Sequence, residues 1–271
     1  MRLVSYDAGD GLRAGVLSDE GVRDAGAGGV GALLRAGRVD AAREIDAPAV
    51  PLEQVRLLPP VTDPQKIVLL GLNYRSHAEE AGLEAPETPT FFAKFPNALA
   101  AHGAEVTLPP YSQKVDYEAE VAFVIGRRAK DVAEGDAVSY IAGYTLLNDL
   151  SARDYQFKTP QWLPGKVFDG SAPCGPALVT PDEAGPPDAI EISLTLNGEE
   201  MQHSTTADLI HSIPATVAYL SMLMTLEPGD IVSTGTPAGV GSVREPRVWL
   251  KPGDVTVVAS PQLGRLETRL G

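Results

Sequence analysis

Two glutamates spaced two residues apart are the first feature of the sequence with a clear chemical meaning. Glu118 and Glu120 lie in the run DYEAEVAFVI at residues 116–125, whose apolar second half predicts a strand that enters the core. Alternate residues of a strand share one face, so we expect the two carboxylates to lie about 7 Å apart and to repel each other. A divalent cation would turn this cost into ligation, and oxygen ligands suit Mg²⁺ or Mn²⁺, with Ca²⁺ as a further choice, better than Zn²⁺.

A third acid is expected at the end of another strand. Residues 140–147 predict a strand, and Asp149 follows it in the run NDLSARD at residues 148–154. An acid at a strand end is well placed to complete a three-carboxylate site with Glu118 and Glu120. Each signal has a simpler interpretation when taken alone, because alternating acids usually line a solvated strand face and Asp149 could cap a helix. The metal site is therefore predicted only from these acids together with further motifs.

The elements that must position these acids are mainly strands. Short runs rich in Val, Ile and Leu are separated by Gly and Pro turns, at residues 66–70, 118–125, 140–147, 192–196, 230–234 and 255–259. One helix is expected over residues 215–226, with Ser212 as its cap and Pro214 in its first turn. The pattern predicts an α+β, mainly β, fold class with a mixed-β core, and not a doubly wound parallel sheet.

The chain is expected to divide into a small N-terminal α/β domain, residues 1–63, and a catalytic domain, residues 64–271. The first unit contains in order a strand, a Gly-Asp-Gly turn, a second strand, a helix and a proline-rich segment, at residues 2–6, 9–11, 13–17, 32–44 and 48–60. This unit carries no obvious chemistry, so we expect the site to lie in the second.

Composition restricts the class of partner and the compartment. The 271 residues are 44% hydrophobic, which is enough for a large core, and 36 acidic against 22 basic residues give a net charge of -14. Such a charge argues against nucleic acid and against an anionic membrane as partners. No apolar run approaches the ~18 residues needed to cross a bilayer, and no signal peptide is recognised. The lone Cys174 fits a reducing compartment and is more often a packed thiol than a nucleophile, so a cytoplasmic location is expected.

Five blocks of sequence resemble the fumarylacetoacetate hydrolase family, in particular its acylpyruvase and 2-hydroxyhepta-2,4-diene-1,7-dioate isomerase-like branch. They are GLNYRSHAEE at 71–80, DYEAE at 116–120, NDLSARD at 148–154, GKVFDG at 165–170, and LEPGD at 226–230 leading to TGTPAGVG at 234–241. The resemblance spans about residues 64–271. It implies a mixed β-roll with a small N-terminal domain, assembled as a homodimer. Residues 81–88 and 170–176 depart from the family pattern, which leaves the substrate open.

The resemblance also implies roles for individual residues. The metal ligands would be Glu118, Glu120 and Asp149; the catalytic residues His77, Glu80 and Lys166; and the substrate-binding residues Arg75, Arg153, Gln156 and Thr236. The spacing of three between His77 and Glu80 lets both meet on one face of a short helix. Without the family blocks, His77 would be interpreted as a surface helix residue, Lys166 as a solvated lysine and Thr236 as part of a tight turn.

The leading hypothesis is hydrolytic cleavage of a carbon–carbon bond in a small 2,4-dioxo acid such as an acylpyruvate. His77 with Glu80 would activate a water molecule that attacks the distal carbonyl. The departing carbanion would be stabilised as an enolate with the help of the metal and Lys166. The expected partner is thus a small anionic oxo-acid.

Other functions remain open from the sequence. A site that stabilises an enolate could equally decarboxylate an oxaloacetate-like acid or shift a double bond in a hydroxydienedioate. A different class of function, a non-catalytic protein that only binds a carboxylate ligand, is also considered. The joint presence of a base and three acids argues against it, because simple binding needs no base beside a metal.

Overall fold

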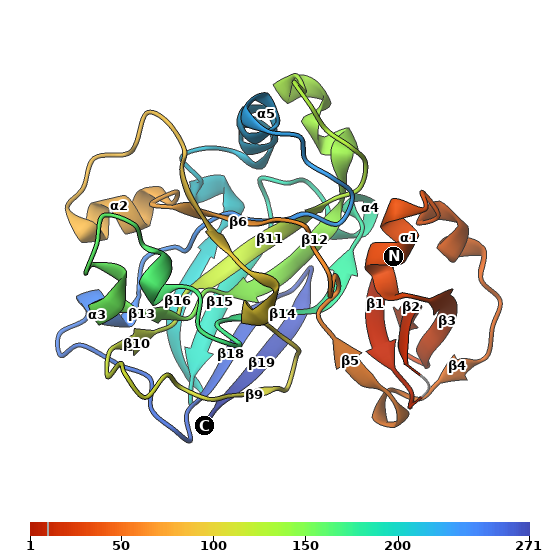
Figure 1. Ribbon diagram of the computed structural model, residues 1–271, viewed down its shortest axis with the longest axis horizontal. Helices are drawn as coiled ribbons and strands as arrows, with labels where there is room; N and C mark the ends of the chain where they lie inside the picture. Colours follow the sequence, from red (N-terminus) through yellow and green to blue (C-terminus); the bar gives the residue numbers. More distant parts are fainter. Residues whose placement is uncertain (10) are drawn as a thin grey trace.

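The computed structural model describes residues 1–9 and 11–271, and a long mixed sheet runs through this part of the chain (Figure 1). Its strands follow the order β4 (Ala49–Val50), β3 (Gly21–Ala27), β2 (Leu12–Ser18), β1 (Arg2–Asp7), β14 (Ala172–Val179), β12 (Ile141–Asn148), β11 (Ala119–Ile125), β17 (Ile231–Ser233), β6 (Ile67–Gly71) and β7 (Thr90–Lys94). In addition, β5 (Arg56–Leu58) pairs with β1, and β8 (Leu99–Ala100) pairs with β14. The pairing is antiparallel between β11 and β12 but parallel between β17 and β6, so the sheet is mixed.

A second sheet packs against the middle of the first. Its order is β16 (Glu199–Thr205), β15 (Glu191–Leu196), β18 (Val255–Ser260), β19 (Gly264–Leu270) and β9 (Glu105–Val106), and a small separate pair joins β10 (Val115–Asp116) to β13 (Ser151–Ala152). One hydrophobic cluster contains Phe123 and Tyr144 of the first sheet together with Leu194 and Val258 of the second. The main core therefore lies between the two sheets, and the fold is α+β and mainly β, as predicted.

Short helices lie around the sheets. They are α1 (Gly29–Arg35), α2 (Arg75–Ala81), α3 (Arg153–Gln156), α4 (Pro181–Ala184) and α5 (Ile213–Leu223), with 3₁₀ turns such as η1 (Asp40–Glu44), η5 (Leu163–Gly165) and η7 (Gly241–Val243). A short segment at residues 72–74 leads from β6 into α2. No helix in the described ranges is long and apolar enough to span a bilayer.

The N-terminal strands lie to one side of the larger body (Figure 1). The predicted hairpin is present, because β1 and β2 pair from Arg2↔Leu17 to Asp7↔Leu12, while Asp10 of the predicted turn lies outside the described residues. β1 also pairs with β14 through Leu3↔Leu178. The N-terminal strands therefore extend the same sheet that carries β11 and β12.

Two predicted helices have different ends in the structure. The helix expected over residues 32–44 is instead α1 followed by the 3₁₀ turn η1, because Gly37 adopts a positive φ of 63° and the Arg38 N–H bonds back to the Leu33 carbonyl. The helix α5 begins as predicted, with the Ser212 side chain accepting from a backbone N–H. It ends at Leu223 and not at residue 226, since residue 226 is held in a strand-like bridge to residue 129.

Candidate metal centre and active site

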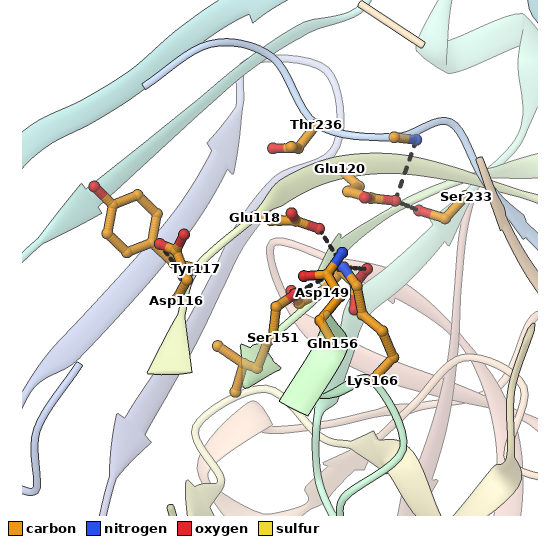
Figure 2. Close-up of polar contacts among 12 residues, drawn as sticks. Asp116, Tyr117, Glu118, Glu120, Asp149, Ser151, Gln156, Lys166, Ser233 and Thr236 are labelled. Carbon is orange, nitrogen blue, oxygen red and sulfur yellow. Dashed lines mark hydrogen bonds and ion pairs between the residues drawn. The ribbon is translucent and has the colours of Figure 1, made fainter. Parts of the chain in front are cut away.

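The three acids predicted from the sequence come together at one point. Glu118 immediately precedes β11, Glu120 lies on it, and Asp149 follows β12. The pairing Ala119↔Asn148 brings the ends of these strands together, and the Asp149 N–H donates to the Glu118 carbonyl at 2.9 Å. One oxygen from each carboxylate lies within 4.8 Å of the other two, and the three residues are only 6%, 1% and 0% exposed. Figure 2 shows Glu118, Glu120 and Asp149 close together.

Two lysines contact the same carboxylates. The Lys166 ammonium donates to Glu118 at 2.8 Å, to Asp149 at 2.6 Å and to the Ser151 hydroxyl at 2.7 Å (Figure 2). The Lys94 ammonium lies 2.8 Å from the other oxygen of Asp149 and is fully buried. Lys166 was identified from the sequence, whereas Lys94 was missed. The sequence signal for Lys94 was weak. Lys94 follows Phe92 by two residues in an apolar strand, so the two side chains share one face of that strand.

An aromatic ring also contacts Lys166. Its ammonium lies 4.9 Å from the centre of the Phe92 ring, and Phe92 in turn packs edge-on against Trp162 with the ring centres 5.7 Å apart. Trp162 also explains the glycine that begins the GLNY block. A Cβ at Gly71 would lie 2.3 Å from the Trp162 ring, so a larger residue there would displace the aromatic wall.

The buried charges at this centre do not balance. The carboxylates are Glu118, Glu120, Asp149 and Asp116, and the cations are Lys94, Lys166 and Arg153. Four negative groups thus face three positive ones in a region from which water is largely excluded. Because an uncompensated buried charge is costly, the centre lacks positive charge that a divalent cation would supply.

The pKa values of the three acids respond to this imbalance in different directions. Burial opposes the ionisation of Glu118, but the charges of Arg153 and Lys166 outweigh it and hold the pKa of Glu118 well below its usual range. Burial raises the pKa of Glu120, and repulsion from Asp149 and Glu118 adds to the effect. Burial also raises the pKa of Asp149, against the opposing influence of Lys166. Glu118 is therefore stable as an anion without an ion, whereas Glu120 and Asp149 are not fully compensated.

The donor set fits a divalent cation. Oδ1 of Asp149 is buried, and its contact among the described residues is the Lys94 ammonium at 2.8 Å. The Ser233 hydroxyl and the Gly235 N–H both donate to Oε2 of Glu120, which fixes that carboxylate while it lines the cavity (Figure 2). Three carboxylates form a hard oxygen set that suits Mg²⁺, Mn²⁺ or Ca²⁺. These residues would hold the ion.

Arg153 and Gln156 extend the centre from α3. The Arg153 guanidinium binds Asp116 at 2.8 Å and Glu118 at 2.7 Å, and it donates to the Gln156 side-chain oxygen at 3.0 Å. The sequence interpretation gave Asp116 no role. It has a positioning role here, because its carboxylate also accepts from the backbone N–H groups of residues 241–242. Its position at the start of the DYEAE block was the available signal.

His77 and Glu80 lie on one face of α2, as their spacing predicted. The His77 Nδ1 is 3.5 Å from the Glu80 carboxylate, and this nitrogen is buried without a hydrogen-bond partner in the described part of the chain. Glu80 instead accepts from the Gly239 N–H at 2.9 and 3.1 Å. Glu80 therefore ties α2 to the loop that follows β17, and His77 keeps one free nitrogen.

A cavity of about 500 Å³ opens over the carboxylates. Most of the predicted site residues line it, namely His77, Glu118, Glu120, Arg153, Gln156, Lys166 and Thr236. Large apolar side chains form much of the remaining wall, among them Leu70, Phe92, Phe157, Trp162 and Trp249. The arrangement combines acids, cations and a histidine at one end of the cavity, and the rest of the lining includes large apolar side chains together with Lys114, Asp154 and Arg247.

The two remaining substrate-binding predictions fall in different places. The Thr236 hydroxyl lines the cavity and accepts from the Gln202 amide at 2.8 Å. Arg75 is exposed, and its guanidinium donates to the Ala207 carbonyl at 3.2 Å. It is not among the residues that line the cavity, so its position gives no support to the expected contact with substrate.

The mainly β fold thus places a buried carboxylate centre, a lysine and a histidine on one cavity, which is the arrangement of an active site that could hold a metal ion and a small acid. Residues 66–271 match the model of the family described as "Fumarylacetoacetate (FAA) hydrolase C-terminal". The chain therefore belongs to the fumarylacetoacetate hydrolase family, which confirms the resemblance drawn from the sequence blocks.

Individual relatives are named for three different reactions. The chain is 43% identical over 218 residues to "Oxaloacetate tautomerase Fahd2a, mitochondrial" of Rattus norvegicus, covering 80% of this chain and 70% of the relative. It superposes with a TM-score of 0.83 and 34% identity on 5-carboxymethyl-2-hydroxymuconate delta-isomerase from Mycobacterium smegmatis, covering 100% and 98% of the two chains. For maleylpyruvate hydrolase from Sphingobium the TM-score is 0.82 and the identity 31%, covering 100% of both chains. These members of the family are enzymes, and their names divide between tautomerase, isomerase and hydrolase.

Proposed function

We propose that this protein is a metal-dependent enzyme that forms the enolate of a small 2-oxo acid and thereby interconverts its keto and enol forms. Oxaloacetate is the leading substrate, since the rat relative at 43% identity is named as its tautomerase. The observation that carries the proposal is Lys166, whose ammonium binds two of the three clustered carboxylates while it faces the cavity. Positive charge and metal ligands thus meet where an enolate oxygen would develop its charge.

The chemistry of enolisation divides between the ion and the chain. A divalent cation, when bound, withdraws electrons from the oxo and carboxylate oxygens and makes the neighbouring carbon more acidic. Lys166 adds a second positive charge at the same end of the cavity. Gln156 and Thr236 offer polar groups that orient the carboxylate of the acid. The carboxylates and Lys166 are themselves buried, and low exposure to water strengthens their electrostatic contacts.

His77 is the proton carrier in this proposal. Neutral imidazole accepts a proton on its unprotonated nitrogen, and the His77 ring lines the cavity while its buried Nδ1 lies on the Glu80 side. It would take the proton from the carbon next to the oxo group and return it to carbon in the reverse reaction. Glu80, 3.5 Å away, would favour the imidazolium that forms in between.

Hydrolysis of a 2,4-dioxo acid, the leading hypothesis from the sequence, is the second candidate. The contact of His77 with Glu80 favours it, because such a pair can activate water, and the Sphingobium neighbour is named as a maleylpyruvate hydrolase. Hydrolysis also requires an enolate leaving group, so both reactions would use the same centre. Decarboxylation of an oxaloacetate-like acid is the third outcome of the same chemistry.

Product analysis with Mg²⁺ or Mn²⁺ present distinguishes these reactions. We expect the protein to convert the enol form of oxaloacetate to the keto form. The loss of enol absorbance monitors this conversion, and the mass of the acid stays unchanged. Acid fragments from an acylpyruvate would signify hydrolysis, and CO₂ release would signify decarboxylation. The proposal fails if the metal-loaded protein accelerates enol–keto exchange no more than buffer with the same metal.

The proposal includes partners and location. It takes Mg²⁺ or Mn²⁺ as cofactor, a small anionic oxo-acid as substrate, a homodimer as the assembly and the cytoplasm as the compartment, with no nucleic acid or membrane partner. The net charge of -14 supports the last point. The rat relative is mitochondrial by its name, so fractionation of the source cells is the direct test of location.

A further inference from the structure

The cavity contains more positive charge than its metal centre uses. Four strong cations line it: Lys114, Arg153, Lys166 and Arg247. Arg153 and Lys166 are bound to carboxylates of the centre. Lys114 and Arg247 are exposed, and neither forms an ion pair with any residue that the structure describes. Their charge is therefore available to a ligand.

Backbone contacts place these two cations on one wall. The Lys114 carbonyl accepts from the Arg153 N–H at 2.9 Å, and the Val115 carbonyl accepts from the Leu250 N–H at 2.9 Å. Arg247 lies three residues before Leu250, and the segment is closed by a bond of 3.0 Å from the residue 248 N–H to the residue 241 carbonyl. Strand β10 and the 241–250 loop thus form one wall, and Figure 1 shows this loop beside β10 and β13.

The same wall contains few groups that would neutralise the cations. Asp154 is the acid that lines the cavity outside the metal centre, and its carboxylate accepts from the Ser112 hydroxyl at 2.5 Å. Two cations therefore remain against one acid that already has a hydrogen-bond donor. In a chain of net charge -14, such a local excess is needed if a multiply charged anion is to enter.

We propose that Lys114 and Arg247 form a subsite for a second anionic group, so that the enzyme selects 2-oxo acids that carry a carboxylate at both ends. The inference rests on the proposed function only in placing the 2-oxo-carboxylate end at the acid centre. The distal carboxylate then lies against the wall of residues 114 and 247, and apolar side chains contact the carbon chain between the two ends. Arg247 suits this contact because its planar guanidinium can bind a carboxylate with two parallel hydrogen bonds.

Calorimetric titration with two acids of equal chain length tests the subsite. 2-Oxoadipate carries the distal carboxylate and 2-oxohexanoate lacks it, and both are titrated into the protein in buffer containing Mg²⁺. We expect the diacid to bind about tenfold more tightly or better, which corresponds to one charge-assisted contact. In Lys114→Gln/Arg247→Gln the preference should disappear, while the affinity for the monoacid stays within about twofold.

A charge-matched variant separates a local contact from the general field. Arg38→Gln/Arg265→Gln removes the same charge from exposed positions outside the cavity lining, and it should retain the preference for the diacid. Loss of preference in both double variants, equal affinity for the two acids in the wild type, or no binding of either acid would overturn the inference. Melting temperatures of both variants show whether they are folded.

The binding test of the subsite and the activity assay of the proposed function can fail independently of each other. If the wild type prefers the diacid but converts no substrate, the proposed function is wrong and the subsite stands. If the wild type tautomerises oxaloacetate but binds the two acids equally, the subsite is wrong and the function stands. The Lys114→Gln/Arg247→Gln variant, assayed with oxaloacetate, should show a raised KM with little change in kcat.

Discussion

Two clusters of charged side chains in this protein differ in how well their charges balance. In the N-terminal strands, Arg13 binds both oxygens of Asp24 at 2.7 and 2.6 Å, and the Tyr6 hydroxyl donates to the same carboxylate at 2.8 Å. At the acid centre, Glu120 and Asp149 are buried without full compensation. The first cluster uses its charges to join strands, whereas the second keeps an excess of negative charge for a cation.

The difference appears in the carboxylate pKa values. The hydrogen bond from Arg13 lowers the pKa of Asp24 to about 2, because the partner favours the charged form. Burial and neighbouring acids raise that of Glu120. A structural ion pair therefore stabilises the folded chain by itself, while a bound cation would stabilise the ionised acids of the centre. Variants of each region should separate folding from function.

Glu120→Gln should have the largest effect on activity. It removes a ligand but keeps the shape and can still accept from Ser233 and Gly235, so the fold should persist and the apo melting temperature should stay equal or rise. Catalysis should fall roughly a thousandfold or more. The rise in melting temperature on adding Mn²⁺ should also disappear.

The matched control for this change is Glu53→Gln, an exposed acid of the N-terminal region. It should keep both activity and metal-dependent stabilisation. If Glu120→Gln still gained stability from Mn²⁺ to the wild-type extent, Glu120 would not be a ligand and the acid centre would need another explanation.

Lys94→Met should have the second largest effect. Lys94 lies 2.8 Å from Asp149 and reaches past the carboxylate to the Ser171 carbonyl at 2.8 Å, so it positions the acid without lining the cavity. We expect metal affinity to fall about 10- to 100-fold, as for other residues that orient a ligand. Calorimetric titration with the metal measures this affinity. At saturating metal, the kcat of the variant should recover most of its wild-type value.

Lys251→Met serves as the control, since Lys251 is an exposed lysine outside the cavity lining. Unchanged metal affinity in Lys94→Met would mean that Lys94 only fills space. Loss of kcat that saturating metal does not restore would instead assign Lys94 a direct part in the reaction.

Lys94 also illustrates what the sequence could not reveal. The spacing of Glu118 and Glu120 was sufficient to predict a shared face, because the period of a strand is two whatever its partners. The approach of β7 to the centre, by contrast, depends on the strand order β11-β17-β6-β7, which no local pattern encodes. Lys94 therefore appeared as an ordinary lysine.

The same distinction applies to the fold. Local signals correctly predicted the start of α5, where Ser212 caps the helix, and the hairpin of β1 and β2. The local signals were wrong for the end of α5, because the pairing of residue 226 with residue 129, far away in the chain, determines where this helix stops. Short-range chemistry was predictable, and long-range pairing was not.

Asp24→Asn should affect stability and leave activity unchanged. The side chain of Asp24 is 34% exposed, so solvent screens its ion pair and we expect a loss of about 1 kcal/mol. Because the folded pKa lies below the ordinary value, this contribution is present above about pH 4 and is lost as the pH falls toward 2. Melting temperatures of wild type and variant should differ at pH 7 and converge in acid; equal values at pH 7 would show that the pair contributes nothing.

Cys174 provides the most subtle test, because it lies where the two regions join. It is on β14, which pairs with β1 on one side and with β12 on the other, and burial raises the pKa of its thiol to about 12. At pH 8 the thiol is therefore protonated and shielded, and we expect no reaction with a chromogenic disulfide reagent in the native state.

In rising urea, the thiol should become reactive in step with the loss of activity, because separating β1 from β14 would expose the strand that also supports β12 and Asp149. Reaction of Cys174 at a urea concentration that leaves activity intact would show that the N-terminal strands open on their own. The balanced cluster around Asp24 would then stabilise a separate unit, although both regions share one continuous sheet.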